Sequence, residues 1–320
     1  MPPEPPRTGT TDAGTSVKEQ LVVTEPASGQ VEREFTVQDR SQLQQAVRRF
    51  LRHRLAVASL VVFILLVLFA FLTPLFWKYG YEKITPDNSV PPSLKHPFGT
   101  DNLGHDMFAQ VVRGLQQSIK VAMSIAVIAT FAGTLWGVVS GFYRGFIDNV
   151  LMRLADLILT IPGIALAAAL ANNFGGTWWI IAIILGSLSA PYVARVVRGV
   201  VLSLREQEYI EASRALGASN LRIMLRHLVP NALAVVIVNA TLLVAGGILA
   251  ETALSFVGFG VRAPDTSLGL LITSAQSAVN TRPWLFYFPG LFIILVSLTV
   301  NFVGDGLRDA LDPRQTRQRR

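Results

Sequence analysis

Long apolar runs are the feature that most limits what this chain can fold into. A helix needs about 20 apolar residues to cross the roughly 30 Å of hydrocarbon in a bilayer. Runs near this length recur and predict about six spans, at residues 55–76, 121–141, 150–171, 178–194, 232–257 and 284–303. Of the 320 residues, 51% are hydrophobic and only 15% are charged, whereas soluble domains carry about 25% charged residues. The sequence therefore predicts an all-α integral membrane protein.

Arginines are distributed unequally over the segments between these runs. They gather before the first run, between the second and third, between the fourth and fifth, and after the sixth. Because positive loops stay in the cytoplasm, this pattern places both termini and residues 203–231 in the cytoplasm. An even number of spans agrees with that orientation. The net charge of +7 is then explained by cytoplasmic loops, and we expect no nucleic-acid partner, since no basic patch on a soluble fold is visible.

The chain divides into a central membrane domain and two tails. Residues 1–41 are rich in Pro, Thr, Gly and Glu, and we expect a disordered cytoplasmic tail there. They do not read as a signal peptide, since the first apolar run starts too far in and no cleavage site follows it. Residues 42–313 form the predicted membrane domain, and residues 314–320 form a basic tail.

Residues 203–231 form a mostly polar stretch between two membrane-length runs. The pattern predicts two short helices. Gly217 suits a left-handed cap at the end of the first helix, and Ser219 suits the N-cap of the second. Pro230 is expected to end the second helix, whose apolar stripe is Leu221, Met224, Leu225 and Leu228. The pattern alone leaves two interpretations open, a docking surface or a solvated loop lying on the membrane.

Small residues and prolines mark places where helices approach or bend. Glycine occurs at every fourth position of the second run, which favours close approach of another helix over a role in gating; these residues are Gly133, Gly137, Gly141 and Gly145. Prolines inside later runs can kink their helices; these are Pro162, Pro191 and Pro289.

A few charged residues fall inside the apolar runs. Glu251 is either a pathway or gating residue or the partner in a structural hydrogen bond to a neighbouring helix, and both alternatives stay open. Asp156 is expected to pair with Arg153 three residues earlier. In the loop after the first run, apolar spacing from Leu103 onward predicts an amphipathic helix at the outer interface, with Thr100 or Asp101 as its cap.

Four stretches together resemble one family. Glu211-Ala212-Ser213, Gly217 and the closing Val229-Pro230 resemble the EAA loop of bacterial ABC-importer permeases, although Ser213 stands where a second alanine is common. Residues 98–106, 251–260 and 304–313 resemble the C-type permease of the dipeptide/oligopeptide (and nickel) importers. His105 replaces the usual arginine of the first of these stretches.

The resemblance implies a type I ABC importer permease fold in the bacterial cytoplasmic (inner) membrane. It implies that a coupling loop contacts the ATPase through Glu211, Ala212, Ser213, Ala215, Gly217 and Pro230. The implied partners are a homologous B-type permease, two ABC ATPase subunits or a fused ATPase, and an extracytoplasmic substrate-binding protein. The implied substrates are dipeptides or oligopeptides, with nickel or another small solute as the alternative.

The chain lacks the parts of a motor or a hydrolase. No G-x-x-x-x-G-K-[ST] loop is present, so ATP and Mg are expected on partner subunits and no cofactor or metal is expected in this chain. No G-x-S-x-G elbow occurs and the histidines lie outside the spans, which predicts a non-catalytic subunit. An ion-coupled secondary transporter is the less favoured alternative, because it would need no coupling loop; a membrane scaffold is another.

Overall fold

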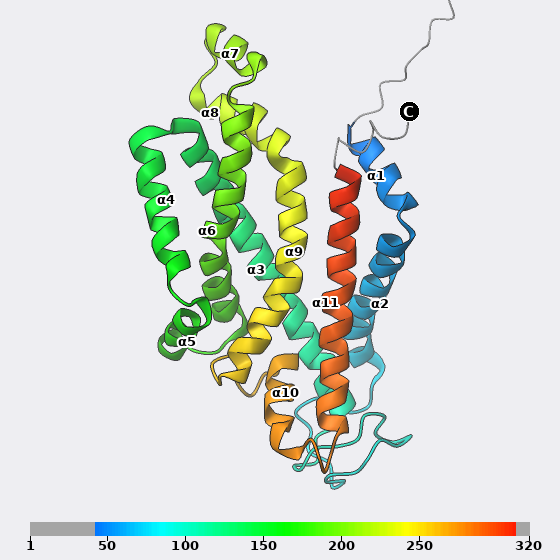
Figure 1. The fold of residues 1–320 in the computed structure, drawn as a ribbon. Coiled ribbons are helices and arrows are strands. Elements are labelled where there is room, and N and C mark those ends of the chain that lie inside the picture. Colours follow the sequence, from blue (N-terminus) through cyan, green and yellow to red (C-terminus); the bar gives the residue numbers. More distant parts are fainter. Residues whose placement is uncertain (1–41, 312–320) are drawn as a thin grey trace, which may run out of the picture. The chain divides into compact units, whose positions relative to one another are not determined.

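A computed structural model describes residues 42–311, which are called the unit below. The expected tails, residues 1–41 and 314–320, lie outside this range. Within it the chain is helical, and its only β pairings are isolated bridges. Figure 1 shows the helices, which are α1 (Gln42–Arg52), α2 (Arg54–Phe76), α3 (Met107–Tyr143), α4 (Gly145–Thr160), α5 (Gly163–Phe174), α6 (Trp178–Leu204), α7 (Glu208–Ala215), α8 (Asn220–Ile223), the π turn η1 (Met224–Leu228), α9 (Val229–Phe256), α10 (Leu268–Ala275), the 3-10 turn η2 (Gln276–Ala278) and α11 (Trp284–Leu311).

Within residues 42–311, five helices are long and apolar enough to span a membrane, and the pair α4–α5 makes a sixth if it counts as one broken span. The start of α2 and the end of α11 lie at the same end of the unit as α7 (Figure 1). An even number of crossings is needed to bring the chain back to that end, so α4 and α5 together act as one crossing. The predicted all-α membrane architecture is confirmed.

The third crossing is not the continuous span predicted at residues 150–171. It is broken between α4 and α5, whose axes differ by 87°. Ile161 is extended, with ψ of 135°, and Pro162 follows it. Proline has no N–H to continue the helix and disfavours helical geometry in the residue before it. The kink expected at Pro162 is therefore a full break.

The amphipathic helix expected along the outer interface is instead the first part of α3. This helix runs unbroken for 37 residues, starts at Met107 rather than Leu103, and is capped by Asp106 rather than Thr100 or Asp101. The Asp106 carboxylate accepts from the Ala109 N–H at 3.0 Å and from the Trp77 indole N–H at 2.8 Å. Outside α3, the outer loop holds this carboxylate through Trp77 and through His96, whose Nδ1 lies 2.7 Å from Asp106 Oδ1. A linear sequence pattern does not reveal these contacts.

Glycines set the contact between α3 and α6. A β-carbon at Gly133 would lie 2.5 Å from Val193 Cβ, and one at Gly137 would lie 2.5 Å from the Ala194 carbonyl oxygen. Gly141 is similarly close to Val201. The prediction that this face admits another helix is confirmed for these three. Gly145 lies outside the contact, as the first residue of α4, with φ of +60°.

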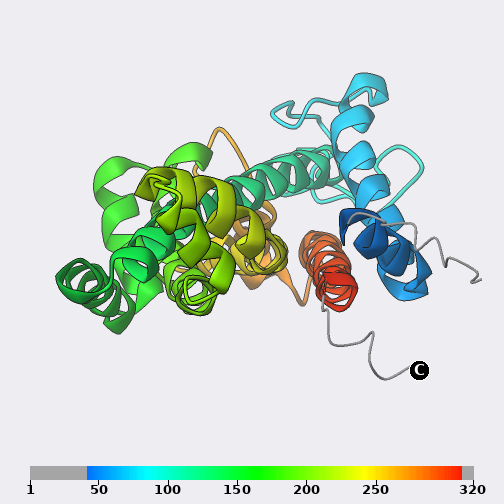
Figure 2. The same cartoon turned by 90° about the horizontal axis from the view of Figure 1, so that it is seen from above.

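The long helix α3 ties the unit together. It packs against α6 and α9 and also against α2 and α10, and Figure 2 shows it running from the α4 side to the α2 side. Aromatic stacking fixes the outer loop to α11, where the Phe98 and Phe288 ring centres are 4.0 Å apart. The core therefore joins segments far apart in sequence and leaves α7 and α8 projecting at one end (Figure 1).

Candidate coupling surface

The projecting segment begins where α6 ends. Ser203 belongs to the last turn of α6, and its hydroxyl donates to the Val200 carbonyl at 2.8 Å. Ser203 therefore continues the helix of the fourth span. The short helix α7 starts five residues later at Glu208, with Gln207 as its N-cap.

Gly217 ends α7 in the left-handed conformation, with φ of +79°. Its N–H donates to the Arg214 carbonyl at 2.9 Å, and the Ala218 N–H donates to the Ser213 carbonyl at 3.0 Å. These two bonds form a Schellman motif, which satisfies carbonyls that would otherwise lack partners at the helix end. The predicted cap at Gly217 is confirmed.

Ser219 begins the second short helix, as predicted, since its hydroxyl accepts from the Arg222 N–H at 3.3 Å. The prediction that Pro230 ends this helix is wrong. The chain continues through one π turn into α9, so that Asn220–Phe256 forms one continuous helical run.

The π turn explains how the helix passes Pro230. The Val229 N–H donates to the Met224 carbonyl, five residues back. The Asn231 side-chain amide donates to the His227 carbonyl at 2.6 Å. The widened turn makes room for the proline ring, and Asn231 satisfies a carbonyl near the gap in the backbone ladder.

Buried aliphatic residues anchor this segment to the spans. Ile210 of α7, Ile223 of α8 and Leu228 of the π turn are fully buried. They pack in one cluster with Val197 and Val201 of α6. The predicted apolar stripe includes neither Ile210 nor Ile223, although Ile223 packs in the same cluster as the stripe residues Met224 and Leu228.

The opposite side of the segment exposes apolar residues. The stripe predicted from Leu221 to Leu228 divides, with Met224 and Leu228 buried but Leu221 and Leu225 exposed. Leu216, beside the Gly217 cap, is 89% exposed. Leu216, Leu221 and Leu225, together with the exposed residues of α7, are called the candidate coupling surface below.

The predicted contact residues divide between two elements. Glu211, Ala212 and Ala215 are exposed on α7. The Ser213 hydroxyl donates to the Tyr209 carbonyl at 2.7 Å, so its hydrogen bond stays within α7. Pro230 is exposed but lies in the first turn of α9, outside α7.

Arginines join the ends of α3 and α6 next to this surface. Arg144, after α3, pairs with Glu206, after α6, and this hydrogen bond lowers the pKa of the Glu206 carboxyl below its ordinary value. The Arg205 guanidinium donates to the Phe142 carbonyl, and the Arg214 guanidinium lies 5.4 Å from the Phe142 ring centre. The ends of α3 and α6 are thereby tied together beneath α7.

Glu251 lies far from this surface, in the outer part of α9, and is fully buried. Its carboxylate is 2.7 Å from the hydroxyls of Ser255 and Ser267 and 3.4 Å from that of Ser118. No cation pairs with it among the described residues. This geometry favours the structural hydrogen bond over a pathway or gating role.

The expected ion pair between Asp156 and Arg153 does not form. Asp156 pairs with Arg195 of α6 instead. A second pair, from Asp148 of α4 to Arg198 of α6, has both N–O distances at 2.6 Å. These pairs join two helices, which spacing along a single helix does not predict.

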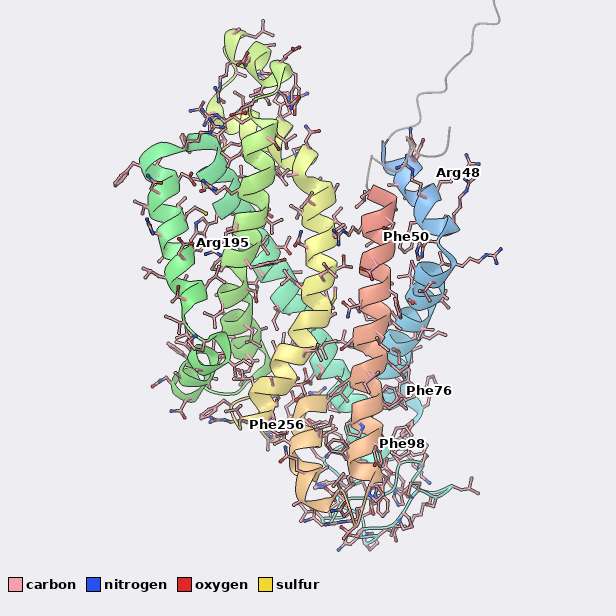
Figure 3. All side chains as sticks on the ribbon, viewed as in Figure 1. Arg48, Phe50, Phe76, Phe98, Arg195 and Phe256 are labelled. Atoms are coloured by element: carbon pink, nitrogen blue, oxygen red, sulfur yellow. The ribbon has the colours of Figure 1, made fainter. Side chains whose placement is uncertain are left out.

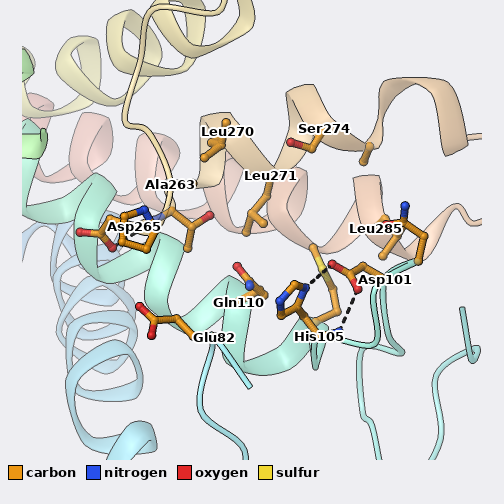
Figure 4. Close-up of a pocket in the computed structure, with 15 residues that line it drawn as sticks. Glu82, Asp101, His105, Gln110, Ala263, Asp265, Leu270, Leu271, Ser274 and Leu285 are labelled. Atoms are coloured by element: carbon orange, nitrogen blue, oxygen red, sulfur yellow. Dashed lines mark hydrogen bonds and ion pairs between the residues drawn. The ribbon is translucent and has the colours of Figure 1, made fainter. Parts of the chain in front are cut away.

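A cavity of about 360 Å³ opens at the other end of the unit, between the outer loop and α10 (Figure 4). Its lining includes Glu82, His105 and Asp265. His105 Nδ1 lies 2.8 Å from Asp101 Oδ2, so the residue that departs from the family motif has a local partner. No group of three or more potential metal ligands occurs among the described residues.

Models of known protein families match most of the chain. Residues 133–317 match the model of the binding-protein-dependent transport system inner membrane component, and residues 41–97 match that of the N-terminal TM domain of oligopeptide transport permease C.

Curated relatives match over nearly their full length. The chain is 41% identical over 278 residues to the oligopeptide transport system permease protein OppC of Mycobacterium tuberculosis, covering 86% of this chain and 95% of the relative. It is 36% identical over 295 residues to the dipeptide transport system permease protein DppC of Alkalihalophilus pseudofirmus, covering 92% and 96% respectively.

A solved structure shares the fold. A chain of the inward-facing MetNI methionine ABC transporter superposes with a TM-score of 0.52 at 24% identity, covering 64% of this chain and 98% of that one. At this identity the likeness concerns the fold alone.

Proposed function

The chain belongs to the family of binding-protein-dependent transport system inner membrane components, and we propose that it is one permease half of an ATP-driven importer of peptides. The observation that carries the proposal is an exposed apolar surface, around Leu216, at the cytoplasmic end of a chain without a phosphate-binding loop. Large apolar side chains grouped in water mark a protein interaction site.

The proposed partners follow from what this chain lacks. A homologous B-type permease supplies the other half of the route, and two ABC ATPase subunits, or a fused pair, bind ATP and Mg. An extracytoplasmic binding protein delivers the peptide. This chain itself does no covalent chemistry and needs no cofactor. The names of the relatives, which include both dipeptide and oligopeptide permeases, support peptides as the substrate class.

In the proposed mechanism, the ATPases transmit their movement to the spans through the candidate coupling surface. ATP binding closes the ATPases and moves the two coupling surfaces together. Since Ile210 and Ile223 are packed against α6, movement of α7 carries the ends of the spans with it. The spans then open outward and receive the peptide, and hydrolysis restores the inward-open state.

A substitution at Leu216 tests this role. We predict that Leu216→Asp abolishes co-purification with the ATPase subunits and lowers peptide uptake at least tenfold, because it places a charge at the docking contact. Leu216 is so exposed that the change should leave the fold intact. Leu94→Asp is the matched control, since Leu94 is fully exposed in the outer loop.

The outcomes separate the alternatives. Unchanged uptake in Leu216→Asp would contradict the coupling role. Uptake by this chain alone, driven by an ion gradient, would instead identify a secondary transporter. Competition by nickel chelates but not by dipeptides or tripeptides would reassign the substrate.

A further inference from the structure

One face of α4 is polar along the length of the helix. Asn149, Arg153, Asp156 and Thr160 are spaced at i, i+4, i+7 and i+11. At about 100° per residue these four positions fall within roughly 60° of arc. All four are at least partly exposed. They are called the α4 polar stripe below.

A separate face of the same helix is apolar and exposed. It carries Ile147, Val150, Leu154 and Leu157. These residues cover the same length of α4 as the stripe, so the stripe lies at the depth where α4 also meets an apolar environment. The stripe is therefore not a part of the helix that has already left the membrane.

The ion pair between Asp156 and Arg195 lies at this depth. Arg195 is nine residues before the end of α6 at Leu204, which is about 14 Å at 1.5 Å per residue. Figure 3 marks Arg195 on α6 beside α4. A long arginine side chain in a membrane helix often extends toward the nearer interface, but this guanidinium pairs with the Asp156 carboxylate of α4.

The two pairs between α4 and α6 differ in exposure. In the pair between Asp148 and Arg198, the Asp148 carboxylate is only 10% exposed, as expected of an ion pair that joins two packed helices. Both side chains of the Asp156–Arg195 pair are 47% exposed. Arg153 makes no ion pair among the described residues. These half-exposed charges need an environment more polar than lipid.

We propose that the α4 polar stripe, together with Arg195, lines the water-filled route through which the transported solute passes. The inference rests on the proposed function and identifies the residues of this chain that line the route. Lipid is excluded as the neighbour, because charged groups facing hydrocarbon are strongly disfavoured. The stripe ends at the break between α4 and α5, where Ile161 and Pro162 are exposed. A peptide can exchange water contacts for contacts with the half-exposed carboxylate and guanidinium.

The absence of cysteine allows a direct test. The 320 residues contain none, so single cysteines report on one position each. Asn149→Cys and Thr160→Cys probe the stripe, and Val150→Cys and Leu157→Cys are matched controls on the apolar face of the same helix. Each variant is assembled with its partner subunits in proteoliposomes and treated with a charged, membrane-impermeant methanethiosulfonate reagent, with and without ATP.

We expect the stripe cysteines to react at least tenfold faster than the controls in one nucleotide state or both. Labelling should also reduce peptide uptake at least fivefold in Thr160→Cys, relative to the same variant before labelling, and leave it unchanged in Leu157→Cys. Equal, slow labelling of all four positions would show a dry contact with the partner permease and overturn the proposal. Fast labelling without loss of uptake would overturn it too.

The proposed function is tested separately in the same preparation. If the unsubstituted chain with its partners takes up no peptide, the proposed function fails whatever the labelling shows. If uptake is present and the stripe is inaccessible, only the placement of the route fails.

Discussion

At the scale of single residues, the backbone geometry of Gly217 bears on the proposed coupling role of α7. Its φ of +79° is readily adopted only by glycine, although a β-carbon there would meet nothing within 4 Å. The cost of a side chain is thus conformational and not steric. It amounts to about 1–2 kcal/mol for a residue without a local compensating bond, which is enough to shift or fray an eight-residue helix.

We therefore predict that Gly217→Val strongly reduces transport while the spans still insert. The control is Gly246→Val, where a β-carbon also meets open space but the backbone is helical. Peptide uptake and ATPase co-purification measure the effect. Normal uptake in Gly217→Val would show that the cap does not matter for coupling.

Glu251 gives a second prediction at this scale. Glutamine is isosteric and can bond to the same hydroxyls of Ser255 and Ser267, so Glu251→Gln should retain most uptake. Glu251→Leu leaves three hydroxyls without their acceptor, at about 1–3 kcal/mol for each group that finds no new partner. We expect a lower unfolding temperature in detergent for the leucine variant. Loss of uptake in a stable Glu251→Gln variant would instead support the gating interpretation.

At the scale of elements, the contact between α3 and α6 depends on the absence of side chains. A β-carbon at Gly137 would approach backbone and Val197 at distances of 2.5–2.8 Å, so any larger residue must push the helices apart. Overpacking of this kind typically costs about 1–3 kcal/mol. Because only residues 205–207 separate α6 from α7, a shift of α6 also displaces the candidate coupling surface.

The corresponding prediction is that Gly137→Val lowers the thermal stability of the detergent-solubilised chain and its uptake together. Gly246→Val serves again as the comparison, because it makes the same change in a membrane helix with open space around it. Equal thermal stability of the two variants would contradict close packing of α3 on α6.

At the scale of the whole molecule, the coupling surface and the outer loop lie at opposite ends of the unit (Figure 1). This separation requires that α4 and α5 count as one crossing. We predict that Leu94→Cys reacts with an impermeant thiol reagent in spheroplasts, whereas Leu216→Cys reacts only after the membrane is opened. Both side chains are highly exposed, so accessibility reports sidedness. Reaction of both from one side would refute the six-crossing topology.

The features that the sequence determined are those with a local cause. Apolar length predicts a span because the bilayer has a set thickness, and arginine placement predicts its direction. Gly217 and Ser219 were assigned correctly because a cap depends on a few adjacent residues. The glycine spacing in α3 likewise marks one helical face, whichever helix packs on it.

Only the tertiary structure decided the features that depend on which helix packs against a given side of another helix. Periodicity identifies apolar positions between Leu221 and Leu228 but not their direction, and only packing on α6 shows that Leu221 and Leu225 point outward. Asp156 pairs across to Arg195 because α4 lies against α6. Asp106, not Thr100 or Asp101, caps α3 because the outer loop holds its carboxylate. The spacing of residues in the sequence determines only the direction in which each side chain leaves its own helix. These contacts also depend on how several helices are placed relative to one another. That placement results from the packing of spans that are far apart in the sequence.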